Sequence, residues 1–246
     1  LTALLVMLFA PFINPSIAQE FRRWQINPDG SISWHISNTI PHSDHIEMSG
    51  KRISCVLRYG VGADGSFHAT RSLVWPMLRT VPNNTHASLT RRFAQDGFDG
   101  VTVNYKPIPA EKVSSITLNG TLLVKSKTED GLVLTRQYFP SIAMPVYCEI
   151  YSIKNGSGKN CVVEIPQTDN IYTTDPVKGT EGSYTIHSTI QNAGYFNLPT
   201  NDSISFSVYY AGRKPGEQMP LVNVDLEKSN RSSFIREVWG NLVLET

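Results

Sequence analysis

The feature that most constrains this chain is an alternation of apolar and polar side chains with a period of two residues. Between Ile204 and Tyr210, apolar residues occupy every second position, and Ser205, Ser207 and Tyr209 fall between them. Such alternation places successive side chains on opposite faces of a β-strand. Similar runs recur along the chain, and Gly, Asn, Asp or Pro separates nearly all of them. The pattern predicts an all-β fold, an antiparallel β-sandwich or super-sandwich.

Turn residues predict how several strands connect. Residues 22–27 and 31–36 flank Pro28-Asp29-Gly30, which is a hairpin signal. Residues 146–154 and 161–165 are likewise expected to form a hairpin around Asn155-Gly156. Further strands are predicted at residues 45–49, 53–59, 66–75, 114–119, 121–126, 132–139, 184–190 and 204–210. Within 53–59, the residues predicted to share one face are Ile53, Cys55, Leu57 and Tyr59.

The N-terminal segment is typical of a secretory signal peptide. Residues 1–9 are almost purely apolar, Pro11 interrupts them, and Ser16-Ile17-Ala18 supplies the small residues of a cleavage site. We therefore interpret residues 1–18 as a signal peptide whose charged start is missing, and we expect a periplasmic or extracellular protein. A buried segment and a membrane anchor are the alternatives. A bilayer-spanning helix needs about 20 apolar residues, so we expect no membrane span.

The C-terminal part changes from strand to helix character. Residues 229–233 offer helix N-caps, and Gly240 is placed as a C-terminal stop. Apolar residues at helical spacing lie between them: Phe234, Ile235, Val238 and Trp239. We therefore expect a β-sandwich domain over residues 19–227 and a helix within residues 228–246. This helix could lie on the sandwich or lead into a helical module.

Composition and charge exclude some classes of protein. The chain is 40% hydrophobic, which is enough for a core and argues against disorder. Its formal net charge is +1 without a long basic run, so we expect no nucleic-acid partner. Three cysteines form no CxxC pattern and are predicted to be buried free thiols: Cys55, Cys148 and Cys161. No motif predicts a cofactor or a metal.

The first candidate site consists of four polar residues close together in the sequence: His42, Asp44, His45 and Glu47. If residues 44–49 form a strand, Ile46 and Met48 face the core, while His45 and Glu47 lie side by side on the polar face. His42 and Asp44 then lie at the mouth of that face. Imidazole and carboxylate groups hydrogen-bond sugar hydroxyls, so one interpretation is a sugar-binding lip. A metal site and a solvated strand edge are the alternatives.

The second candidate site is a proline-bracketed loop with four side chains able to contact a ligand: Trp75, Arg79, Asn84 and His86. Pro76 and Pro82 restrict the preceding residues to extended or turn geometry, which favours a rigid loop. Aromatic rings stack on the apolar faces of sugars, which suits Trp75 to a carbohydrate ligand. The alternative is that Trp75 lies in the core and that residues 83–84 form a turn.

The sequence selects no catalytic pair. Glycosidic cleavage needs two carboxyl groups about 5–10 Å apart. Four acids are candidates by residue type alone: Asp44, Glu47, Asp96 and Asp99. Nothing in their spacing favours two of them, and the chain has no G-x-S-x-G elbow, phosphate loop or G-x-G-x-x-G motif.

Three longer stretches carry a family resemblance. They are DHIEMSG at 44–50, VWPMLRTVPNNTHASL at 74–89 and FIREVWGNLVLET at 234–246. Together they resemble the N-terminal β-sandwich region of bacterial six-hairpin glycoside hydrolases, over roughly residues 19–246. In that family the sandwich precedes an (α/α)6 barrel. The resemblance implies that the catalytic carboxylates lie in a barrel absent from this chain, so we assign no catalytic residue, and that residues 228–246 lead into that barrel.

The resemblance also implies a function, the hydrolysis of O-glycosyl bonds in carbohydrate by a secreted enzyme. The sandwich is then expected to pack against the helical catalytic module of the same chain and to complete the active-site rim with the two candidate sites. The alternatives are a stand-alone carbohydrate-binding module, a structural interaction domain and a polysaccharide lyase, which also combines a helical toroid with β-sandwiches. The order of the modules favours the hydrolase, but the fold does not specify the sugar.

Overall fold

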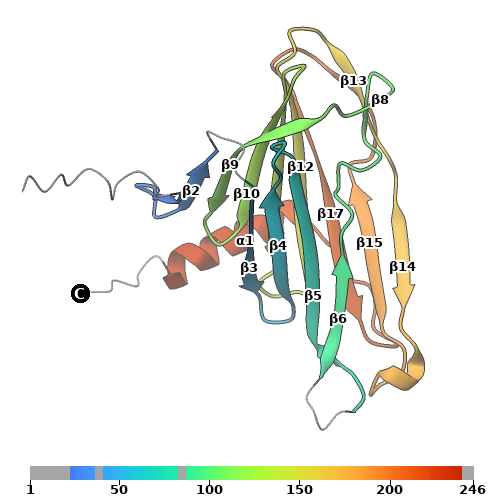
Figure 1. Cartoon of the computed structure of the whole chain (residues 1–246). Helices are drawn as coiled ribbons and strands as arrows, with labels where there is room; N and C mark the ends of the chain where they lie inside the picture. The colour runs from blue at the N-terminus through green and yellow to red at the C-terminus, as the bar shows by residue number, and fades with distance from the viewer. Residues whose placement is uncertain (1–22, 37–40, 83–86, 240–246) are drawn as a thin grey trace, which may run out of the picture.

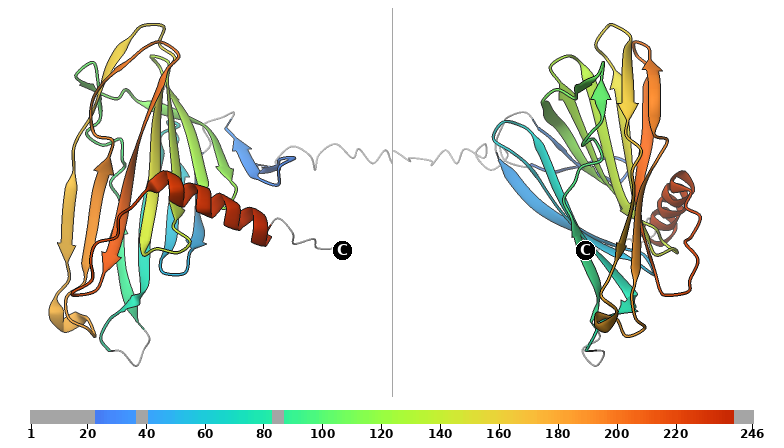
Figure 2. Two further views of the ribbon diagram at one scale, coloured as in Figure 1. Left: turned by 180° about the vertical axis from the view of Figure 1, so that it is seen from behind. Right: turned by 90° about the vertical axis from the view of Figure 1, so that its right-hand side faces the viewer.

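Three layers make up the protein (Figures 1 and 2). The computed structural model describes residues 23–36, 41–82 and 87–239. A four-stranded sheet packs on a nine-stranded sheet, and helix α1 (Val224–Phe234) lies across the outer face of the larger sheet. Strands make up 55% of the structure and helices 9%, so the predicted all-β class is confirmed.

The nine-stranded sheet is antiparallel throughout. In spatial order it contains β1 (Gln25–Ile26), β2 (Ile32–His35), β9 (Glu111–Leu118), β10 (Leu122–Thr128), β11 (Leu132–Pro140), β12 (Val146–Asn155), β17 (Ser203–Arg213), β15 (Thr185–Gln191) and β14 (Asp169–Thr173). The β1–β2 hairpin confirms the turn signal at residues 28–30, where Gly30 adopts a φ of 80° that favours glycine.

Two smaller sheets complete the fold. The first is an antiparallel meander of β3 (His42–Ser49), β4 (Ser54–Val61), β5 (Phe67–Arg79) and β6 (Ser88–Phe93). The second contains β16 (Gly194–Leu198), β13 (Cys161–Ile165), β7 (Thr102–Val103) and β8 (Lys106–Pro107). A short 3₁₀ turn occupies Pro176–Lys178.

The main core lies between the meander and the nine-stranded sheet. The four residues predicted to share one face of β4 are at most 2% exposed: Ile53, Cys55, Leu57 and Tyr59. Burying an aliphatic side chain such as Ile53 or Leu57 contributes about 1.5–3 kcal/mol. Tyr147 and Tyr151 of β12 enter the same core from the opposite sheet.

A second core lies between the nine-stranded sheet and α1. It contains Phe139, Val146, Cys148, Tyr209, Ala211 and Val224. Strand β12 therefore has both faces buried, with Val146 and Cys148 on the helix side and Tyr147 and Tyr151 on the sandwich side. Apolar residues therefore occur on both faces of its first half, whereas Lys154 near its end is exposed. The three cysteines are buried and free, as predicted.

The predicted hairpin between residues 146–154 and 161–165 is wrong. Strand β12 pairs with β11 and β17, whereas β13 pairs with β16 and β7 in a different sheet. The chain crosses from one sheet to the other after Asn155. The side-chain amide of Asn155 donates to the Lys159 carbonyl at 2.8 Å and the Leu198 carbonyl at 3.0 Å, and these bonds hold the crossing in place. The Asn-Gly signal therefore marks a crossing between sheets.

Helix α1 begins earlier than predicted. Its N-cap is Asn223, whose side-chain oxygen accepts a hydrogen bond from the Leu226 amide at 3.0 Å. The predicted caps at residues 229–233 lie inside the helix, where the Ser229 hydroxyl donates to the Asp225 carbonyl at 3.0 Å. A π-helical turn, Ile235–Trp239, continues α1. The helix starts at Val224, before the predicted boundary at residue 228, and Val224 packs on the nine-stranded sheet.

Candidate functional site

Strand β3 separates its side chains as the sequence predicts. Met48 is 4% exposed and Ile46 is partly buried against the core. His45 and Glu47 are exposed on the outer face of the meander. Their backbone partners on β4 are Arg58 for His45 and Val56 for Glu47. The outer face of β3 is thus a polar strand surface that a ligand can reach.

His42 lies on the inner side of β3 and is partly enclosed. Its ring meets Trp34 edge-on with 5.0 Å between centroids, and its Nδ1 is in contact with the Arg23 guanidinium. Asp44 Oδ2 lies 3.7 Å from the other ring nitrogen. Burial and the charge of Arg23 lower the pKa of His42, and Asp44 opposes them. His42 therefore belongs to an aromatic corner at the start of β3.

Asp44 and His45 line one hollow of about 410 Å³ on the meander. Arg58, His68 and Arg92 line it as well. The Asp44 carboxylate accepts a hydrogen bond from the His45 amide at 2.8 Å, which fixes it at the edge of the hollow. The structure thus brings together Asp44 and His45, with Glu47 two residues further along the outer face.

The second candidate stretch does not join this surface. Trp75 is 0% exposed, and its Nε1 donates to the Pro145 carbonyl at 2.9 Å. Of the two interpretations of Trp75 given above, the structure therefore has the one in which this side chain lies in the core. The Arg79 carbonyl accepts a hydrogen bond from the Tyr184 hydroxyl at 2.6 Å, and that contact ties the end of β5 to the loop before β15. Asn84 and His86 lie outside the described residues.

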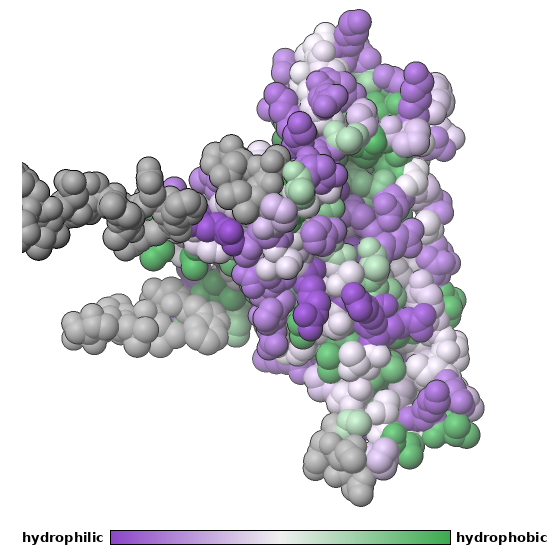
Figure 3. All heavy atoms as spheres, in the orientation of Figure 1, coloured by the Kyte–Doolittle hydropathy of each residue, from purple (hydrophilic) through white to green (hydrophobic). Residues whose placement is uncertain are grey.

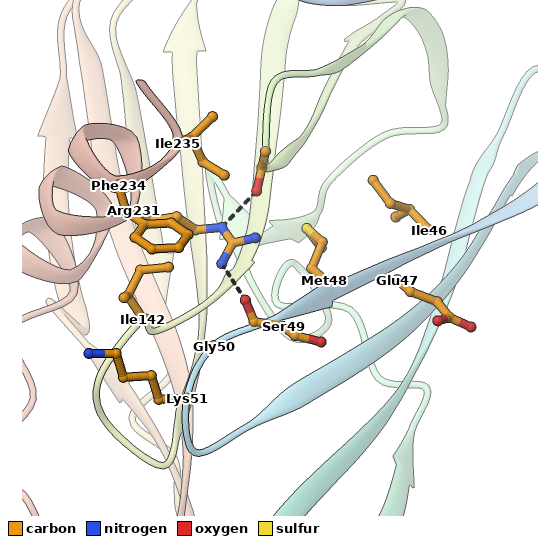
Figure 4. A pocket seen from close by; sticks show the side chains of 11 residues that line it. Ile46, Glu47, Met48, Ser49, Gly50, Lys51, Ile142, Arg231, Phe234 and Ile235 are labelled. Atoms are coloured by element: carbon orange, nitrogen blue, oxygen red, sulfur yellow. Dashed lines mark hydrogen bonds between the residues drawn. The ribbon is translucent and has the colours of Figure 1, made fainter. Parts of the chain in front are cut away.

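A second hollow lies where α1 reaches β3 (Figure 4). Its volume is about 780 Å³. The apolar side chains that line it are Ile46, Met48, Ile142, Phe234 and Ile235. Glu47 and Lys51 also line it, and the Glu47 carboxylate points away from Arg231. One strand therefore contributes both to this apolar hollow and to the polar outer face.

Arg231 holds α1 against three separate segments. Its Nε donates to the Gly120 carbonyl at 2.6 Å, and its Nη1 donates to the Ser49 carbonyl at 3.2 Å (Figure 4). Nη1 also donates to the Pro140 carbonyl at 3.1 Å. Burial lowers the pKa of Arg231 to about 10. One turn earlier in the helix, Glu227 accepts a hydrogen bond from the Ser141 hydroxyl. Sequence reasoning missed these residues because their partners are distant in the chain.

Charged groups also join the two sheets inside the sandwich. Arg71 of β5 forms a buried pair with Glu149 of β12, and the Tyr151 hydroxyl donates to Glu149 at 2.5 Å. Burial alone would lower the pKa of Arg71, but the charge of Glu149 outweighs it and holds this pKa well above its usual range. Arg136 pairs with Asp96 at 2.9 Å and Glu111 at 2.7 Å. These carboxylates neutralise buried arginines, which is a structural role.

Two of the four acids named from the sequence lie away from β3. The Asp96 carboxylate pairs with Arg136, and Asp99 accepts a hydrogen bond from the Asp96 amide at 2.9 Å in the loop after β6. Among the described residues, no group of three or more His, Cys, Asp or Glu side chains is arranged to hold a metal ion. None of the described helices is long and apolar enough to cross a bilayer.

No protein-family model matches this chain, and no curated protein matches it either. The functional argument therefore depends on the residues themselves. Two of the hollows in the described part of the chain meet at β3. One is the polar hollow at Asp44 and His45, and the other is the apolar hollow beside α1.

Proposed function

We propose that this chain is the β-sandwich part of a secreted glycoside hydrolase, which hydrolyses O-glycosyl bonds in carbohydrate. In this proposal the sandwich packs against a helical catalytic module. The observation that carries the proposal is the apolar hollow between β3 and the end of α1 (Figure 4). Phe234 and Ile235 are only partly buried there. Apolar side chains that stay partly exposed around a hollow gain stability when another structural element covers them and removes their surface from water.

The position of β3 links this packing surface to a substrate. A module seated in the hollow lies beside Glu47, and His45 lies next along the outer face. Both side chains are exposed and can hydrogen-bond sugar hydroxyls. We therefore assign His45 and Glu47, with Asp44 at the edge, to the rim of the active site. Trp75 takes no part because it is buried.

The resemblance of residues 44–50, 74–89 and 234–246 to six-hairpin hydrolases supports the same proposal, and the signal-like residues 1–18 support secretion. The competing proposal of a stand-alone binding module accounts for the polar face of β3. It gives no role to the apolar hollow beside α1.

The test is an assay of the product of the whole gene for release of reducing sugar from a panel of polysaccharides. We expect hydrolysis, and we expect His45→Ala and Glu47→Gln to raise KM about tenfold, since the first removes an imidazole hydrogen bond to substrate and the second replaces a charged acceptor with an amide. Lys125→Gln, on the exposed side of β10, is the matched control and should leave KM unchanged. Absence of hydrolysis, or unchanged KM in both rim variants, would contradict the proposal.

The packing surface is tested separately. Phe234→Ser removes an aromatic side chain from the hollow, whereas Leu226→Ser removes a 54% exposed side chain from the same helix. We expect the first change to lower the unfolding temperature of the whole product and the second to have little effect. Equal effects of the two changes would show that no module covers the hollow.

A further inference from the structure

The outer face of the meander carries a row of nitrogen-bearing side chains. The row, called here the strip, consists of one residue from each strand: His45 on β3, Arg58 on β4, His68 on β5 and Arg92 on β6. All four are exposed, and all line the hollow of about 410 Å³. Neighbouring strands are about 4.8 Å apart, so the strip extends about 14 Å across the sheet.

Strand register places these side chains together. His45 is the backbone partner of Arg58, and Arg58 is the partner of Thr70. The Arg92 guanidinium lies 3.5 Å from the Thr70 hydroxyl, so it leans into the same row. A Cβ atom at Gly60 would overlap the His68 ring, which shows that this ring lies across β4 toward β3. The glycine at this position therefore leaves room for the His68 ring beside the hollow.

The two arginines of the strip have no acidic partner in the described part of the chain. Three carboxylates lie near the strip. Asp44 is engaged with His42 and with the His45 amide, and Asp64 with the amide and hydroxyl of Ser66. Glu47 lies on the same outer face. Arg58 and Arg92 thus present guanidinium groups to solvent, and their planar donors match carboxylates and other oxyanions.

The rest of the face favours a glycan over a nucleic acid. Ser43 and Thr70 line the hollow and offer hydroxyls to a polyhydroxylated ligand. None of the large exposed hydrophobic side chains of the described residues lies on this face, so it lacks the aromatic platforms on which unpaired bases stack. Figure 3 shows mainly hydrophilic and near-neutral residues over β3–β6.

We propose that the outer face of the meander binds an anionic glycan. Its carboxylate or sulfate groups pair with Arg58 and Arg92, and its hydroxyls bond Ser43 and Thr70. The inference rests on the proposed function and names the substrate class of the same rim. The length of the strip fits a segment of several sugar units rather than a single sugar.

Affinity electrophoresis of the chain in gels containing polygalacturonate, dextran sulfate or neutral dextran tests this inference. We expect one of the two anionic polymers to retard the chain and neutral dextran to have no effect. The polymer that acts distinguishes a carboxylate ligand from a sulfate ligand. Retardation by neutral dextran, or by no polymer, overturns the inference.

Paired variants separate specific binding from general charge attraction. Arg58→Gln with Arg92→Gln should weaken retardation by about tenfold or more, because two charge-assisted contacts are lost. Lys125→Gln with Lys127→Gln removes the same charge from exposed positions on β10 and should change it less than about twofold. Equal effects of both pairs overturn the inference. All four side chains are exposed, so the unfolding temperatures should match.

The two proposals can fail separately. If the whole gene product cleaves only neutral glycans and the arginine variants cleave them as fast as the unchanged protein does, the anionic ligand is refuted and the hydrolase stands. If the gene product cleaves nothing while the chain binds an anionic polymer through Arg58 and Arg92, the hydrolase is refuted and the binding face stands.

Discussion

Replacing Glu149 with leucine tests whether a buried charge pair joins the two sheets. The side chains of Arg71 and Glu149 are 1% and 0% exposed, and Arg71 Nη2 donates to Glu149 Oε2 at 2.5 Å. Removing one partner of such a pair costs about 3–5 kcal/mol, because the other charge stays buried without compensation. We expect Glu149→Leu to lower the free energy of unfolding by this amount, since an arginine cannot release its proton.

Removing both charges should recover part of that loss. In Arg71→Met with Glu149→Leu, no charge remains uncompensated. The Gln95 carbonyl loses its hydrogen bond from Arg71 Nη1, which measures 2.5 Å, and the Tyr151 hydroxyl loses its acceptor. The Tyr151 hydroxyl also loses the hydrogen bond that Arg71 Nη2 donates at 3.1 Å. Three lost hydrogen bonds cost about 3 kcal/mol. The double variant should therefore be more stable than Glu149→Leu alone.

Urea unfolding followed by tryptophan fluorescence measures these differences, because Trp75 is fully buried and reports on the core. The matched control is Glu181→Gln. Its partner Lys214 lies at 2.6 Å, but Glu181 is 47% exposed, so the expected cost is below about 1 kcal/mol. A cost below about 1 kcal/mol for Glu149→Leu would refute the reasoning. So would a double variant whose loss of unfolding free energy equals the sum of the losses in Arg71→Met and Glu149→Leu.

Three further predictions concern the helix, the start of β3 and the thiols. Arg231→Met should lower the free energy of unfolding by about 2–4 kcal/mol, because three carbonyls lose a charged donor. The control Asn230→Ala, at an exposed position of the same helix, should change it by less than about 0.5 kcal/mol in the same urea assay. Because burial and Arg23 lower the pKa of His42, the unfolded chain binds its proton more readily, so stability is full above about pH 6.5 and declines below it. His42→Gln should reduce this decline, measured as the urea midpoint between about pH 7.5 and about pH 5, and an unchanged decline would exclude His42 as its source. Burial raises the pKa of the Cys55 thiol to about 12, and all three cysteines are buried. A thiol reagent should therefore modify no cysteine in the folded protein and all three in urea. Rapid modification of the folded protein would contradict this burial.

Strand predictions were correct where one face of a strand meets the core and the other meets solvent. The alternation at residues 53–59 identified the buried face of β4 because its outer residues are more exposed. The first half of β12 shows no such contrast, because α1 covers its second face. Its partners were also hidden, since strand pairing depends on contacts far apart in the chain. Asn155 looks like a turn residue in the sequence, yet its side chain fastens the crossing between two sheets.

The candidate site was predictable in part for similar reasons. His45 and Glu47 are two residues apart, so strand geometry alone predicts that they share one face of β3, and both are exposed there. The burial of Trp75 depends on Pro145, which lies 70 residues away. Arg231 gains its partners across 91, 111 and 182 residues, and no spacing in the sequence signals them. The predicted start of α1 lies too far along the chain, because serines that are good N-caps lie in the interior of the helix.

The contacts of Arg231 have a mechanical consequence. One guanidinium joins the helix to the ends of β3 and β11, at Ser49 and Pro140, and to Gly120 in the turn between β9 and β10. A force applied to the end of α1 is therefore shared by three attachments and is not concentrated on one. Ser49 is also the last residue of β3, two positions from Glu47. Any displacement of the helix is thus transmitted along a single strand to the polar face.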